Sequence, residues 1–223
     1  MNAHKTVIKN TTRTLLLIAA VAVTLVGLPA WAGQGFGGLG GAGLGLGGGG
    51  HGSGTGITAL SEEEAAILTY MREEEKLARD VYLCMYEQWE AAIFNRIAIS
   101  EQQHMDTMGK KLDKYSLPDP ALPTIGLFTN PDLQAKYDQL VADGVLSYID
   151  GLEAGADIEE IDMLDIQYAI DITTHLDVVT AYQNLLEGSK NHLRAFVGAL
   201  AAQGIEYVPR YISQELFDAI MDL

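Results

Sequence analysis

A glutamate and a histidine that stand three residues apart are the sharpest chemical signal in the sequence. Glu101 and His104 would share one face of a helix and lie close enough to ligate one or two metal ions. The pattern Glu-x-x-His also arises by chance, and an isolated inward histidine is more often a hydrogen-bonded core residue. Glu75 and His192 favour a shared metal, because each interrupts the apolar stripe of another predicted helix and a buried carboxylate is costly unless it is paired or coordinated. Carboxylate and imidazole ligands suit iron or manganese, and zinc is a further candidate.

A third helix contains more acids than one face can hold. One of its faces carries Glu159 and Asp162 among apolar residues, and another carries Asp165. We favour the first face, because it pairs two carboxylates at i and i+3 in the same way as the Glu-x-x-His pair. Glu160 is a further candidate ligand. The alternative is that most of these acids form a solvated face, as most helical charge runs do.

Helical periodicity runs through residues 60–223, and no segment shows convincing strand alternation. Ser61 and Glu64 form a capping box that opens a helix of about 28 residues. The other expected helices are a long one over about 93–115, a short one from Asn130-Pro131 to about Gly144, a third long one ending near Asp171, a fourth over about 175–203, and a short one from Ser213. A long connection, including residues 116–143, separates the second long helix from the third. This pattern predicts an all-α, ferritin-like four-helix bundle with one long crossover between its second and third helices and short extra helices.

The amino-terminal part of the chain differs from this helical domain in composition. Residues 1–32 have the pattern of a secretory signal peptide, because basic residues precede an apolar run that ends before a cleavage motif near Ala32. The run is shorter than the roughly 20 residues that span a bilayer, so we expect no membrane span after cleavage. Residues 33–59 are mostly glycine and predict a flexible tether, with self-association or surface attachment as the alternative. The domain at 60–223 would then be periplasmic or secreted, without an internal disulfide because Cys84 is the only cysteine.

The charge of the chain excludes one class of partner. The sequence has 14 Lys and Arg against 30 Asp and Glu, for a formal charge of −16. All the acids lie at or after Glu62, so removal of the basic leader would make the mature protein more acidic still. Phosphate backbones need clustered Lys and Arg, and we therefore expect no nucleic-acid partner. An acidic surface favours cations or serves solubility.

Four stretches of the sequence carry a resemblance to a known family: MREEEKLARDVY at 71–82, IAISEQQHM at 97–105, IEEID at 158–162 and GSKNHLRAF at 188–196. They resemble the ferritin-like family known as domain of unknown function 2202, over essentially residues 62–200. The wider superfamily is similar to rubrerythrin and bacterioferritin, whose four-helix bundles hold two irons between glutamates and Glu-x-x-His pairs. The resemblance therefore implies a di-iron or di-manganese carboxylate site in this chain.

The resemblance also implies roles for individual residues. The matching positions are Glu75 and Tyr82 on the first helix, Glu101 and His104 on the second, and His192 on the fourth. The chain departs from the pattern at Ser189, where those relatives have a glutamate. Asp162 beside Glu159 could restore the total of four carboxylates and two imidazoles, although from a different helix and with a shorter side chain.

Three classes of function follow from these expectations. The first is a di-metal oxidoreductase that oxidises ferrous ion or reduces O₂ or peroxide, in which Tyr82 hydrogen bonds to a ligand carboxylate, relays one electron, or is only a core tyrosine. Such an enzyme would need an external electron donor or a sacrificial ferrous ion, because the sequence has no Cys-x-x-Cys for a built-in rubredoxin centre. The second class is a non-catalytic iron or metal-binding module, and the third is a metal-free tethered helical interaction domain. Each is compatible with a homo-oligomer.

Overall fold

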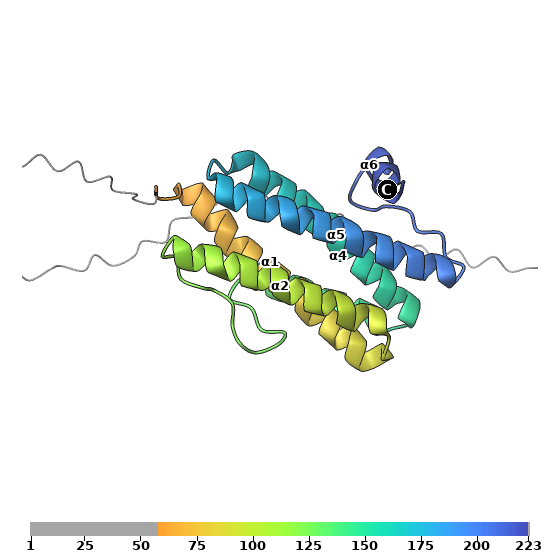
Figure 1. Cartoon of the computed structure of the whole chain (residues 1–223). Coiled ribbons are helices and arrows are strands. Elements are labelled where there is room, and N and C mark those ends of the chain that lie inside the picture. Colours follow the sequence, from red (N-terminus) through yellow and green to blue (C-terminus); the bar gives the residue numbers. More distant parts are fainter. Residues whose placement is uncertain (1–57, 223) are drawn as a thin grey trace, which may run out of the picture. The chain divides into compact units, whose positions relative to one another are not determined.

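The computed structural model describes residues 58–222 (Figure 1). The described part is all-helical and contains no strand. Its helices are α1 Glu62–Trp89, α2 Ala92–Lys114, α3 Pro131–Gly144, α4 Tyr148–Ile172, α5 Leu176–Ala202 and α6 Gln214–Met221. The predicted signal peptide at 1–32 and nearly all of the predicted tether at 33–59 lie outside the described residues. None of the helices in the described part is both long enough and apolar enough to cross a membrane.

α1 and α3 begin where their capping residues predict. The Ser61 hydroxyl accepts a hydrogen bond from the Glu64 backbone, and the Glu64 carboxylate accepts one from the Ser61 backbone, so the capping box of α1 is complete. Asn130 caps α3 by accepting from the next two non-proline backbone amides, and Pro131 occupies the first turn. α1 ends at Glu90, whose φ of 52° places it in the left-handed region that stops a helix.

The long helices pack in pairs around an apolar interior. α1 lies chiefly against α2, and α4 chiefly against α5, while contacts of α1 with α4 and of α2 with α5 join the two pairs. α3 lies against α1 and α4, and α6 touches α5 (Figure 1). One core cluster includes Val81, Phe94 and Phe196. A second includes Met108 and other apolar side chains, and it lies toward the opposite ends of the same four helices. On each long helix, polar residues stand between the positions that belong to these two clusters.

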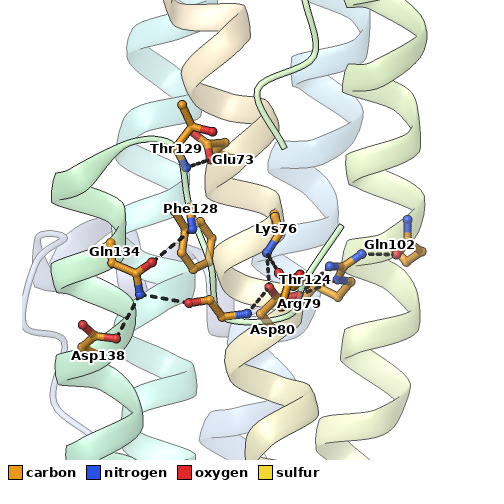
Figure 2. A network of polar contacts seen from close by, with 11 residues as sticks. Glu73, Lys76, Arg79, Asp80, Gln102, Thr124, Phe128, Thr129, Gln134 and Asp138 are labelled. Atoms are coloured by element: carbon orange, nitrogen blue, oxygen red, sulfur yellow. Dashed lines mark hydrogen bonds and ion pairs between the residues drawn. The ribbon is translucent and has the colours of Figure 1, made fainter. Parts of the chain in front are cut away.

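The connection between α2 and α3 is held on the outer face of α1 by buried charges (Figure 2). Glu73 accepts hydrogen bonds from the backbone amides of Thr129 and Asn130, at 2.6 and 3.0 Å. Asp80 accepts one from the amide of Gly126 at 2.9 Å and pairs with Lys76, whose ammonium also donates to a backbone carbonyl of the connection. Because buried charges are stable only when their partners are complete, this network fixes the path of the connection.

Candidate metal centre

The structure gathers the six sequence-predicted ligands into one polar layer between the two core clusters. They are Glu75 of α1, Glu101 and His104 of α2, Glu159 and Asp162 of α4, and His192 of α5. All four carboxylates and His192 are buried, and His104 is half-buried. Two groups of donor atoms have the spacing of a metal site, with all atoms of a group within 4.8 Å of one another. One group contains Glu75 and His104, the other contains Glu159 and His192, and Glu101 belongs to both.

Glu101 joins the two groups because each of its oxygens faces a different histidine. Its Oε2 lies 2.8 Å from Nδ1 of His104, and its Oε1 lies 2.7 Å from Nδ1 of His192. His104 Nδ1 is also 3.2 Å from a Glu75 oxygen, and His192 Nδ1 is 3.5 Å from a Glu159 oxygen. A carboxylate in this position could bridge two ions, with one imidazole and one further carboxylate on each side.

Hydroxyl groups from two helices orient the group that contains Glu159 and His192. The Tyr82 hydroxyl lies 2.5 Å from Oε1 of Glu159, to which it donates. Ser100, directly before the Glu-x-x-His pair, lies 2.9 Å from Nε2 of His192, so that Nδ1 of this ring is the nitrogen that faces the carboxylates. Metal-binding histidines are usually fixed in this way through their other ring nitrogen.

Ser189 supplies the corresponding support to Asp162. Its hydroxyl lies 2.6 Å from Oδ2 of Asp162, and both residues are buried. The serine of α5 thus directs a carboxylate that comes from α4. Asp162 is close enough to the other acids for the charges of Glu75, Glu159 and Glu101 to act on its pKa.

Close packing of α5 against α2 depends on a residue without a side chain. A β-carbon at Gly188 would lie 2.6 Å from Cε1 and from Nε2 of His104, which is closer than nonbonded atoms approach. Glycine at this position therefore leaves the space that the imidazole ring occupies. The ring of His104 is also 5.6 Å from that of His192, measured between centroids.

Three buried polar atoms of the centre have no hydrogen-bond partner. They are Oε1 of Glu75, Oδ1 of Asp162 and Nδ1 of His192. Although Nδ1 of His192 lies 2.7 Å from Glu101, the two atoms are not aligned for a hydrogen bond. An unsatisfied buried polar atom costs about 1–3 kcal/mol, so a group that contacted all three atoms would remove a considerable cost.

The charges of the centre depend strongly on one another. Burial lowers the pKa of both histidines, but the carboxylates outweigh it and raise the pKa of His104 to about 11 and that of His192 to about 10. Burial raises the pKa of Glu75 to about 8 even though His104 opposes the change. For Glu101, burial is outweighed by the two nearby histidines, and its pKa falls below the usual range. Protons on the imidazoles thus offset part of the acid charge, and a bound cation would replace them.

The remaining acids of α4 lie elsewhere. Glu160, a further candidate ligand from the sequence, is buried but faces away from the centre: it accepts hydrogen bonds from the Tyr207 hydroxyl and from backbone amides at positions 210–212. It fixes the carboxy-terminal segment rather than a metal. Asp165 is partly exposed, and Tyr168, which shares its helix face, is exposed. The face with Glu159 and Asp162 is the inward one.

The sequence reasoning did not identify Ser100 or Gly188 as part of this centre. Ser100 directly precedes Glu101, and Gly188 lies four residues before His192, one helical turn away on the same face. A small residue one turn from a predicted ligand is a usable signal, although it does not reveal which side chain will fill the space. The sequence also did not single out Glu74, which is a buried acid. It lies next to Glu75 in the chain but contacts different residues.

Comparison with known proteins gives a family and a fold relative. A family model described as "Uncharacterized protein domain (DUF2202)" matches residues 64–223. The chain is 47% identical over 163 residues to the uncharacterized protein MJ0754 of Methanocaldococcus jannaschii, an alignment that covers 73% of this chain and 88% of the relative. The crystal structure of hypothetical protein MJ0754 is similar to this fold with a TM-score of 0.74 and 45% identity, covering 77% of this chain and 98% of that one.

Proposed function

Since the chain belongs to the family of uncharacterized DUF2202 domains, we propose from its site that it is a ferritin-like protein binding two divalent metal ions, iron or manganese, in the buried polar layer. The observation that carries this proposal is the position of Glu101. Its two carboxylate oxygens face two different histidines at 2.8 and 2.7 Å, as a carboxylate that bridges two ions would.

The residues present fit such a pair of ions. Glu75 and His104 would ligate one ion, Glu159 and His192 the other, and Glu101 would bridge them. The unpartnered atoms named above, one on each of three residues, would become ligand atoms. Asp162, held by Ser189, would supply the fourth carboxylate, so that four negative charges would meet the four positive charges of two divalent ions.

The arrangement of the helices agrees with this proposal. α1, α2, α4 and α5 are the four long helices, and each contributes at least one residue of the proposed ligand set. The segment between α2 and α4 is long and contains α3, as expected for a bundle with one long crossover. In this interpretation α3 and α6 are the short extra helices of a ferritin-like domain.

We propose that the reaction is the oxidation of ferrous ion or the reduction of O₂ or peroxide. Two bound ferrous ions would supply two electrons, which with two protons convert one peroxide into two waters. The chain's own residues exclude bulk water, hold the carboxylates in register and keep Glu159 in place through the Tyr82 hydroxyl. An external donor or further ferrous ion would have to restore the electrons. The proposed location is the periplasm or the medium, after cleavage near Ala32.

The test is the metal content of the chain produced with iron, together with its near-ultraviolet spectrum. We expect two irons per chain and a near-ultraviolet absorption, both lost in the Glu101→Ala/His104→Ala variant. Glu187→Gln is a matched control, because Glu187 is an exposed acid of α5 that pairs only with a neighbouring lysine at 2.6 Å. A wild-type protein that binds no metal and is no more stable than the double variant would overturn the proposal. Oxygen uptake on addition of ferrous ion then distinguishes an oxidase from a passive metal binder.

A further inference from the structure

A second group of acidic side chains lies between α1 and α4, next to the proposed centre but built from other residues. Burial raises the pKa of Glu74 of α1, and Asp165 of α4 is close enough for its charge to raise this pKa further. The hydroxyl of Tyr70 lies 3.4 Å from Oε1 of Glu74 and 3.4 Å from Oδ2 of Asp165. Two carboxyl groups and a phenol from two helices therefore converge on one point.

Glu74 is the residue that this group leaves unsatisfied. Its side chain is 95% buried, and its Oε2 has no hydrogen-bond partner. A buried carboxylate oxygen needs a donor or a cation. The Tyr70 hydroxyl has a single proton, which cannot serve both carboxylates. A divalent cation at the place where Glu74 and Asp165 meet would satisfy this oxygen and offset the charge of both acids.

We propose that Glu74 and Asp165, with Tyr70 between them, form a third divalent-cation site for Mn²⁺ or Fe²⁺. The donors are all oxygen, which suits hard divalent cations rather than metals that prefer sulfur. Asp165 is partly exposed and Glu74 is buried, so an ion could enter from the side of Asp165.

Lys136 of α3 shows that this group already attracts positive charge. Its ammonium lies 3.6 Å from Oε1 of Glu74, and its side chain is 30% exposed. It approaches the carboxylate oxygen that also contacts Tyr70, and it leaves Oε2 unpartnered. Lys136 thus competes with a cation at the outer side of the site, and its long side chain can turn toward solvent when an ion binds.

The position of the third cation site suggests how it could supply metal ions to the proposed two-ion centre. Asp165 follows Asp162 by three residues on α4, and Glu74 directly precedes Glu75 on α1, so both helices pass from one site to the other within a turn. An ion held by Glu74 would be one step from the acids of the centre. This delivery role rests on the proposed function, whereas binding at Glu74 does not.

The experiment counts Mn²⁺ ions bound to the full chain, by electron paramagnetic resonance of the free ion during titration. We expect three ions for the wild type, two for Glu74→Gln and for Asp165→Asn, and one for Glu101→Ala/His104→Ala. Lys136→Gln should bind the third ion several-fold more tightly, because a competing cation is removed. Asp171→Asn is the matched control: Asp171 is an exposed acid of α4, bonded to Gln167, and its loss should leave three ions bound.

The outcomes separate this proposal from the proposed function. If the wild type binds one ion and Glu74→Gln binds none, the third site exists and the di-metal centre does not. If Glu74→Gln and Asp165→Asn bind as many ions as the wild type, a shared proton occupies the place and the third site is wrong. An unaltered Mn²⁺ affinity in Lys136→Gln would also overturn it. Should Glu74→Gln fail to fold, Mn²⁺-soaked wild-type crystals decide the question, by the presence or absence of an anomalous peak between Glu74 and Asp165.

Discussion

Replacing Ser189 by alanine tests whether Asp162 is a metal ligand. The serine hydroxyl lies 2.6 Å from Oδ2 of Asp162 in the interior, and the substitution removes it without adding volume. Burial, followed by the charges of Glu75 and Glu159, raises the pKa of Asp162 well above its usual value. In the metal-free protein burial therefore favours the protonated form of Asp162, in which the hydrogen bond from Ser189 is one between neutral groups.

The protonation of Asp162 determines how much the Ser189 hydrogen bond contributes to stability and to metal affinity. A neutral hydrogen bond contributes about 0.5–1.5 kcal/mol, so the free energy of unfolding of metal-free Ser189→Ala should fall by about 1 kcal/mol. A bound metal would require Asp162 to be ionised, and a hydrogen bond to a charged group contributes about 1.5–3 kcal/mol. The difference of about 1–1.5 kcal/mol belongs to metal binding and corresponds to a loss of about fivefold to tenfold in affinity.

The two quantities are measured separately, by denaturant unfolding of the metal-free protein and by calorimetric titration with Mn²⁺. Thr180→Ala is the matched control on α5, because the Thr180 hydroxyl is exposed and bonds only to the backbone carbonyl of Leu176, at 2.7 Å. Its Mn²⁺ affinity should equal that of the wild type. If Ser189→Ala loses stability but keeps the wild-type affinity, Asp162 does not ligate the metal and the reasoning is refuted.

Three further predictions concern the same structure. In Gly188→Ala the new methyl group would clash with the ring of His104, at a cost in stability of about 1–3 kcal/mol, which the better helix propensity of alanine offsets by about 1 kcal/mol. The Mn²⁺ affinity should fall at least as far as in Ser189→Ala. Thermal unfolding measures the stability, and calorimetry measures the affinity. The raised pKa of Glu75, about 8, and of the two site histidines, about 11 and 10, means that the folded metal-free protein holds protons that the unfolded chain has released. Its stability should therefore fall as pH rises above the unfolded values of these groups, while Mn²⁺ affinity rises with pH; proton release on Mn²⁺ addition checks the sign. Asp80→Asn leaves the buried ammonium of Lys76 without its carboxylate and should cost about 3–5 kcal/mol in denaturant unfolding without changing the metal count (Figure 2).

The ends of the helices could be predicted because each depends on a few neighbouring residues. The capping box at Ser61 and the Asn130-Pro131 start of α3 were both predicted from spacing, and both are confirmed. The all-helical class follows from the same periodicity and is confirmed as well. The helix expected from Ile93 begins one residue earlier, where no side chain caps it and the sequence gives no signal.

The partners of the buried acids could not be predicted in the same way. Glu160 is as deeply buried as Glu159, and periodicity alone leaves both as candidate ligands. What separates them is a segment some fifty positions later, whose backbone amides from Arg210 onward bind the Glu160 carboxylate. Glu74 likewise differs from Glu75 through its partners, because it contacts Tyr70 and Lys136 whereas Glu75 contacts His104 of α2. Such choices depend on tertiary contacts, which the spacing of residues along one helix does not contain.

In the proposed ferritin-like site, Ser189 and Asp162 amount to an exchange of one ligand between two helices: α4 supplies the carboxylate that relatives of that kind carry on α5. A serine hydroxyl on α5 is too short to replace a glutamate at a metal, but it can donate to a carboxylate that arrives from α4. The exchange keeps the number of carboxylates in the layer at four, and it leaves Oδ1 of Asp162 buried and unpartnered. If Asp162 were only a structural acid, Ser189 could satisfy one of its oxygens but nothing in the described part of the chain satisfies the other. The proposed pair of divalent ions would account for that oxygen and for the charge together. Under this proposal Ser189→Ala should weaken metal binding more than its loss of one neutral hydrogen bond implies.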